Sequence, residues 1–243
     1  MLIRPFFLAT LSAALGDGWR LAAATRGVST AYSLIFTLGG LLISGGLLAG
    51  GLLPFVVAAA GAFMLVGPIL LAGFYGIAEA HESGRQAGMA AVFAGFRQAA
   101  PTLWIIALVC ALLFMIFITD AAILYSYMVG GTPVWLEDLL PRSGAIMNFV
   151  FWAGVSGAVI AFLLYTASAF AVPLLCERRA GLVEAIVTSA RVVLGNPGPA
   201  LVWAVLLTLL IMLGILLLPL LPVLLPWLAF ASRALYRQVL LPG

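Results

Sequence analysis

The sequence predicts an all-α membrane protein, a polytopic bundle of six transmembrane helices. Of its 243 residues, 65% are apolar and only 8% are charged, whereas soluble domains carry about 25% charged residues. The apolar residues also form stretches of roughly 20 or more, the length that about 30 Å of hydrocarbon requires. Short segments of alternating polarity are absent from the sequence, so a membrane β-barrel is not expected.

Six stretches are predicted to cross the bilayer, and three amphipathic segments are predicted to lie in its headgroup layer. Together they form one integral membrane domain over residues 1–243. The predicted spans are residues 28–49, 53–78, 101–121, 147–175, 199–216 and 219–236. The predicted interfacial helices are residues 6–24, 86–98 and 181–194.

The first amphipathic segment, residues 6–24, has features of a signal peptide, because one arginine precedes a short apolar stretch. Asp17, Arg20 and Arg26 follow, however, without a clear small-x-small cleavage site. We therefore favour a helix that lies at the membrane surface and remains part of the protein.

The first spans have features that are typical of membrane helices. Gly46 and Gly50 in span one have the small-xxx-small spacing that lets two helices approach closely. Span two contains Pro54 and Pro68, which a bilayer tolerates where neighbouring groups re-satisfy the backbone. Span three is expected to begin near Pro101, since proline favours the first turn of a helix.

The last apolar stretch, residues 200–231, admits two arrangements. It is too long for one ordinary span and short for two full spans. Three prolines, at positions 219, 222 and 226, favour a break with a tight turn between Gly214 and Pro222. A single long, tilted helix is the alternative.

The arginines predict the orientation. The chain has eleven basic residues, all of them arginine. With six spans and a cytoplasmic N-terminus, Arg142 alone falls on the outer side, in the loop formed by residues 131–145. The inner side receives Arg4, Arg20, Arg26, Arg85, Arg97, Arg178, Arg179, Arg191, Arg233 and Arg237. This distribution follows the positive-inside rule, so we expect a multi-pass protein of a bacterial inner membrane with both termini cytoplasmic.

A weak threefold repeat accompanies this layout. Three times, a short amphipathic segment with an arginine near its end precedes two apolar stretches; these arginines are Arg20, Arg97 and Arg191. The pattern predicts three units, each an interfacial helix followed by a helical hairpin, packed into one bundle. A chance pattern is the alternative.

Several short motifs resemble a known family of membrane proteins. They are Gly67-Pro68, Gly73-Phe74-Tyr75, Thr188-Ser189-Ala190-Arg191, Asn196-Pro197-Gly198-Pro199 and Leu235-Tyr236-Arg237. These motifs, the C-terminal ones more closely, resemble the proteobacterial family called domain of unknown function 2189. Its members are predicted integral membrane proteins without an established activity, so the resemblance implies topology and no mechanism. Some members carry histidines just before the final Tyr-Arg, where this chain has Ala229-Phe230-Ala231-Ser232.

Asp120 is the acidic residue that lies within an apolar stretch. An intramembrane carboxylate suggests a proton or cation site. If span three begins at Pro101, however, Asp120 lies about 28 Å along the helix, near the outer interface. The sequence favours this interfacial position.

Arg233, near the end of span six, is a second unusual charge. Its side chain either snorkels to the interface, which we favour, or pairs with Glu79 or Glu177, which end spans two and four. Arg191, near the end of the third amphipathic segment, completes the set of candidate polar residues.

The sequence offers little support for catalysis or cofactor binding. His81 is the single histidine of the chain, which excludes a bis-histidine haem site within it. With Glu79 and Glu82 it makes an incomplete metal-ligand set. No phosphate loop, nucleophile elbow or groove-reading element occurs in a plausible context. We therefore expect no enzyme, no cofactor or metal, and no nucleic-acid partner.

Two functional hypotheses remain. The favoured one is a non-catalytic accessory, assembly or scaffold subunit, which sits in the lipid bilayer and packs against other membrane subunits. The few polar residues within the spans suit this role. The alternative is a small-solute permease or channel, which needs a polar pathway near the middle of the membrane. Its candidate lining residues are Thr119, Asp120, Tyr125, Tyr165, Thr166 and Ser168.

Overall fold

A computed structural model describes residues 2–50, 63–99, 101–129 and 144–241, which are almost entirely helical. The α-helices are α1 (Leu8–Ala24), α2 (Arg26–Ala49), α4 (Phe63–Glu82), α5 (Met89–Gln98), α6 (Thr102–Val129), α7 (Gly144–Ser168), α8 (Ala171–Cys176), α9 (Leu182–Gly195), α10 (Pro197–Leu216) and α11 (Leu221–Val239). A short 3-10 helix, η2 (Leu218–Leu220), joins the last two. The strands β1 (Leu2–Ile3) and β2 (Leu240–Leu241) pair antiparallel and tie the two ends of the chain together.

Among the described residues, five helical stretches are long and apolar enough to cross a membrane. They are Arg26–Ala49, Leu103–Met128, Met147–Cys176, Pro197–Leu216 and Leu218–Val239. The first ten residues of predicted span two, 53–62, lie outside the described residues, and the rest of that span lies in α4. The predicted all-α fold and a multi-pass, integral membrane protein are thereby confirmed.

The last apolar stretch folds as two helices. The α10 helix ends at Leu216, and α11 begins at Leu221. Pro219 and Pro222 lack the N–H groups that a continuous α-helix would need here, which explains the break. The single long helix considered as an alternative is therefore not formed.

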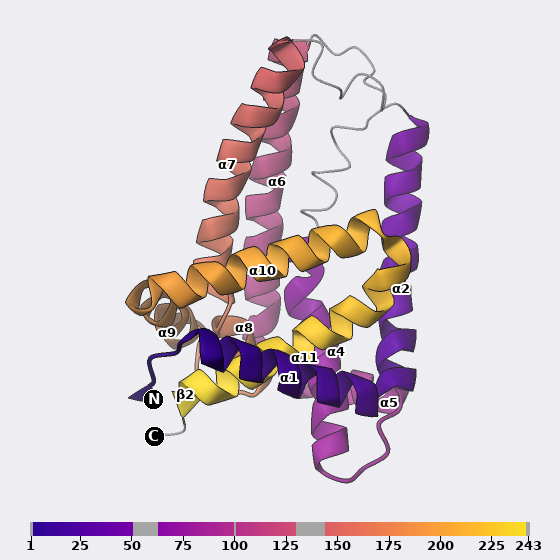
Figure 1. The fold of residues 1–243 in the computed structure, drawn as a ribbon, viewed down its shortest axis with the longest axis vertical. Coiled ribbons are helices and arrows are strands. Elements are labelled where there is room, and N and C mark those ends of the chain that lie inside the picture. Colours follow the sequence, from indigo (N-terminus) through magenta and orange to yellow (C-terminus); the bar gives the residue numbers. More distant parts are fainter. Residues whose placement is uncertain (1, 51–62, 100, 130–143, 242–243) are drawn as a thin grey trace.

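The helices lie in two broad directions (Figure 1). The long helices α2, α6 and α7 run along the long axis of the molecule, and α6 packs beside α7. The helices α1, α5 and α9 and both chain ends gather toward one end of this axis. The α10 helix instead runs across the view, and α11 returns obliquely beneath it.

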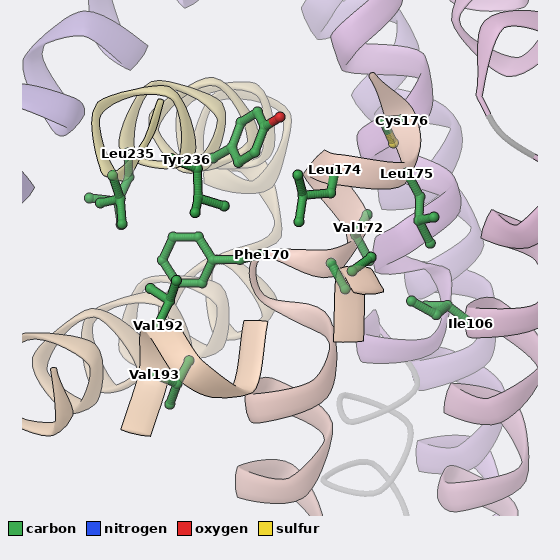
Figure 2. Packing of buried hydrophobic residues seen from close by; sticks show 14 of the residues in the cluster. Ile106, Phe170, Val172, Leu174, Leu175, Cys176, Val192, Val193, Leu235 and Tyr236 are labelled. Carbon is green, nitrogen blue, oxygen red and sulfur yellow. The ribbon is translucent and has the colours of Figure 1, made fainter. Parts of the chain in front are cut away.

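The core is centred on α8, whose six residues are all buried. Phe170, just before α8, packs against Phe6, with 6.2 Å between the ring centroids. Figure 2 shows Leu235 and Tyr236 of α11 and Val192 of α9 around the same ring. The N-terminal segment, α8, α9 and α11 thus share one apolar core at the end where the chain termini meet.

Glycines allow close contact between α4 and α5. A Cβ atom at Gly76 would clash with the backbone oxygen of Ala91, and one at Gly95 would clash with that of Ala72. The close approach predicted around Gly46 is not found among the described residues, since a Cβ atom there meets nothing within 4 Å. The physical reason is that α2 packs through its first half, where Tyr32 is buried.

Candidate functional site: a charge cluster around a buried arginine

Arg233 lies in α11, and its side chain is only 5% exposed. Both terminal nitrogens of its guanidinium reach the carboxylate of Glu82, the last residue of α4. Nη1 donates to Oε1, and Nη2 donates to Oε2 at 3.0 Å. This two-point contact is the strong form of an arginine–carboxylate pair.

Glu177 and Arg237 extend the arrangement, and Arg179 Nε lies 3.0 Å from Glu177 Oε2 at its edge. Arg237 donates from Nε to Oε1 of Glu177 at 3.0 Å and from Nη1 to Oε2 of Glu82 at 3.0 Å. Arg233 Nε also lies 3.6 Å from Glu177 Oε1. We call Glu82, Glu177, Arg233 and Arg237 the charge cluster. Its two positive and two negative charges alternate, so each charge faces opposite charges as neighbours.

Three separate segments bring the charge cluster together. Arg233 and Arg237 are four residues apart on α11 and therefore share one helix face. Glu82 ends α4, and Glu177 follows α8 directly. The charge cluster thus ties α4, α8 and α11 together at the end of the molecule where the chain termini lie.

Aromatic rings and a small cavity flank the charge cluster. The Arg233 guanidinium lies 5.6 Å from the ring centroid of Tyr75, and that of Arg179 lies 5.7 Å from the centroid of Tyr236. Both contacts are of the cation–π type. The cavity beside them has a volume of about 190 Å³. It is lined by Tyr75, Gly76, Glu79, Gly95, Gln98, Cys176, Glu177, Arg179, Arg233 and Arg237.

Glu82 is held in its ionised form. Partial burial alone would raise its pKa, but hydrogen bonds and positive charge from Arg233 and Arg237 lower the pKa below the ordinary value of 4.5. Arginine stays protonated at physiological pH. The charge cluster therefore suits a permanent electrostatic clamp better than acid–base chemistry near neutral pH.

The structure brings together two of the predicted site residues, Arg233 and Glu177. The favoured hypothesis, in which Arg233 snorkels to the interface, does not match its burial and its pairing. Glu79 instead accepts a hydrogen bond from Gln98 Nε2 at 2.9 Å. Arg191 is exposed on α9, away from the charge cluster.

Asp120 lies on α6, which contributes no residue to the charge cluster. Its Oδ2 accepts a hydrogen bond of 2.6 Å from the Ser156 hydroxyl on α7. The bond links two long helices that pack side by side. It gives the carboxylate a structural partner.

The candidate polar site residues predicted from the sequence did not include Glu82 and Arg237. The spacing of Arg233 and Arg237 was a usable signal, because residues four apart lie on one helix face. Glu79 and Glu82 are three apart on α4, and the sequence alone does not tell which of them faces α11.

The sequence model of one protein family matches residues 55–177. That family is described as a predicted integral membrane protein, domain of unknown function 2189. The match covers half of the chain. The chain belongs to this family. No curated protein and no solved structure matches it.

The matched range of the family divides the charge cluster. It includes Glu82 and Glu177 but ends before Arg233 and Arg237. Among the motifs that suggested this family, Gly67-Pro68 and Gly73-Phe74-Tyr75 lie within the match. The C-terminal motifs, which resembled the family more closely, lie outside it.

Proposed function

We propose that this chain is a non-catalytic accessory, assembly or scaffold subunit of a membrane complex. The observation that carries the proposal is the apolar outer surface of the long helices. On α6, Leu108, Leu112 and Met115 are each more than half exposed, and on α7 Phe151 and Val159 are too. Such faces suit lipid tails or the helices of a partner subunit.

The polar side chains of the long helices support the same proposal. Thr119 donates its hydroxyl hydrogen to Met115 O, Ser168 to Leu164 O, and Tyr165 to Ala200 O. These bonds tie the groups to nearby backbone and leave them poorly suited to line a continuous polar path. A permease or channel is therefore the less favoured function.

The topology belongs to the proposal as well. We place both termini in the cytoplasm of a bacterial inner membrane, supported by the ten-to-one arginine count. The order of the described helices supports three units, in which α1, α5 and α9 each precede a pair of longer helices. The arginine count does not depend on how deeply the last pair enters the bilayer, because residues 199–236 return to the side they left.

Cross-linking in native membranes, followed by purification in mild detergent and mass spectrometry, tests the accessory role. A photoreactive amino acid at Leu112, which is 56% exposed on α6, should capture a stoichiometric membrane protein. The matched control places it at Ile106, which is 4% exposed on the same helix and should capture no partner. The proposal would be contradicted if the chain purified alone from both variants and enclosed a hydrated central cavity. That result would favour transport.

A further inference from the structure

The turn between α10 and α11 is entirely apolar. Residues 209–231 contain no charged, amide or hydroxyl side chain. The turns after α4 and α9, by contrast, contain Ser83 and Asn196. Turns that emerge into water are normally rich in polar residues, since their groups are hydrated there. The composition of the α10–α11 turn therefore suits a position within hydrocarbon.

The start of α11 packs at the middle of α2. Leu221 belongs to the buried cluster that contains Tyr32, and Phe36 packs against this cluster. Phe36 lies ten residues beyond Arg26, which is about 15 Å along the helix. This depth is half of the roughly 30 Å that a bilayer core measures.

The buried cluster that contains Leu221 extends along α4 from Ala78 to Leu70, and Leu70 marks its limit away from the charged end. Leu70 of α4 lies in the same buried cluster as Leu221. Twelve residues separate it from Glu82 in the charge cluster, which corresponds to about 18 Å of helix. The turn therefore lies well short of a full bilayer thickness from the charged end of the molecule.

The C-terminal part of α11 lies along α1, the helix on which Arg20 is exposed and Asp17 is partly exposed. Trp227 Nε1 donates to Leu15 O at 2.9 Å, and Gly18 lies directly against the Ala231 backbone. If α1 lies at the membrane surface, most of α11 lies just beneath it. An upright, membrane-crossing α11 is incompatible with this contact.

The length of α10 requires a strong tilt. The α10 helix has 20 residues, so it is about 30 Å long. If it begins at the charged end, reaching a depth of only 15–18 Å inclines it by roughly 53–60° from the direction of α2. Figure 1 shows this arrangement, with α10 running across the long helices and the turn beside the middle of α2.

The turn also satisfies its own backbone groups. Leu217 N donates to Leu213 O, and Leu220 N donates to Leu217 O, both at 2.8 Å. Pro219 and Pro222 have no N–H to satisfy. Non-helical backbone at membrane depth is tolerated only where its polar groups are satisfied, and these four residues of the turn meet that condition for their N–H groups.

We propose that α10 and α11 form a re-entrant hairpin, which enters the bilayer from the side of the charge cluster and turns back near the bilayer centre. The last two predicted spans then become one half-inserted unit, while both termini keep their predicted side. The inference rests on the membrane location of the chain and does not depend on the accessory role.

Spin labels in reconstituted phospholipid vesicles test the depth of the turn. A nitroxide at Leu216, which is 81% exposed, is placed on a background with Cys110 and Cys176 replaced by alanine. Its accessibility to oxygen and to a water-soluble nickel chelate is compared with labels at Ile35 and Leu48 on α2. Ile35 marks the middle of α2, and Leu48 marks its far end.

The Leu216 label should match Ile35, with high oxygen and low nickel accessibility. A match to Leu48 would show that the hairpin crosses the bilayer and would overturn the inference. A label at Leu217, which is 50% exposed, gives an independent second measurement. Variants are compared only when their melting temperature and monodispersity equal those of the parent protein. If Leu216→Cys does not fold, a Leu217→Cys variant that meets these two criteria decides the question.

Discussion

At the residue scale, Arg233 is the most deeply buried member of the charge cluster. Its guanidinium is buried, contacts Glu82 at two points, and lies against the Tyr75 ring. Burying a charge is costly unless opposite charges and hydrogen bonds compensate it. The charge cluster supplies this compensation, so its members are expected to be energetically coupled.

Replacing Arg233 by methionine should destabilise the protein by about 3 kcal/mol. This value is near the lower end of the range measured when one partner of a buried ion pair is removed, because Glu82 is partly exposed. Melting temperatures in detergent measure the effect, with Arg191→Met as the control at an exposed arginine. Combining Arg233→Met with Glu177→Gln should cost less than the sum of the two single changes. Additive losses would show that the two residues do not interact.

The ionisation of Glu82 predicts a pH dependence. Its pKa is lower in the folded chain than the ordinary 4.5, so its contribution to stability is fully present above about pH 4.5. That contribution is lost as the pH falls through the folded value. Glu82→Gln should therefore be less stable than the parent at pH 7, and the gap should narrow toward pH 3. Melting curves that differ equally at both pH values would contradict this assignment.

At the scale of elements, close helix contact depends on glycine at few positions. In α4 and α5, Gly76 and Gly95 let two backbones approach where any side chain would clash. The Gly46 region of α2 has the same sequence pattern without such a contact among the described residues. Spacing alone therefore does not identify a packed glycine, because a second helix must lie at the same level.

Gly76→Ala should lower stability by about 1–3 kcal/mol, since the added methyl group forces α4 and α5 apart. Gly45→Ala makes the same chemical change in α2, where a Cβ atom meets nothing within 4 Å of the described atoms. It should be neutral or stabilise by up to about 1 kcal/mol, because alanine favours a helix. Thermal unfolding of both variants in one detergent gives the comparison, and equal losses would count against the packed α4–α5 contact.

At the scale of the whole molecule, the charged end and the long apolar helices have different surroundings. The charge cluster, the surface-helix candidates and both termini gather at one end, and the exposed faces of α6 and α7 extend away from it. This separation of a charged end from an apolar end agrees with the proposed orientation, in which arginine-rich segments face the cytoplasm.

Reporter fusions should reproduce this orientation. Alkaline phosphatase, which is active only outside the cytoplasm, should be active when fused after Gly144 and inactive when fused after Ser83 or Gly243. A fluorescent protein that folds only in the cytoplasm should give the opposite result. Activity of the phosphatase after Ser83 would reverse the proposed orientation. The predicted outer loop itself, with Arg142, falls largely outside the described residues.

The sequence by itself determined the all-α membrane class and the approximate places of the helices, because hydrophobic length is a local property. It also indicated the break before Pro222, since missing N–H groups act within one helical turn. Only the tertiary structure decided that Glu82, rather than Glu79, faces Arg233, and that α10 and α11 lie oblique to α2. Helix rotation and tilt depend on contacts between segments far apart in the sequence. Apolar content, which is alike for an upright and an inclined helix, carries no information about them.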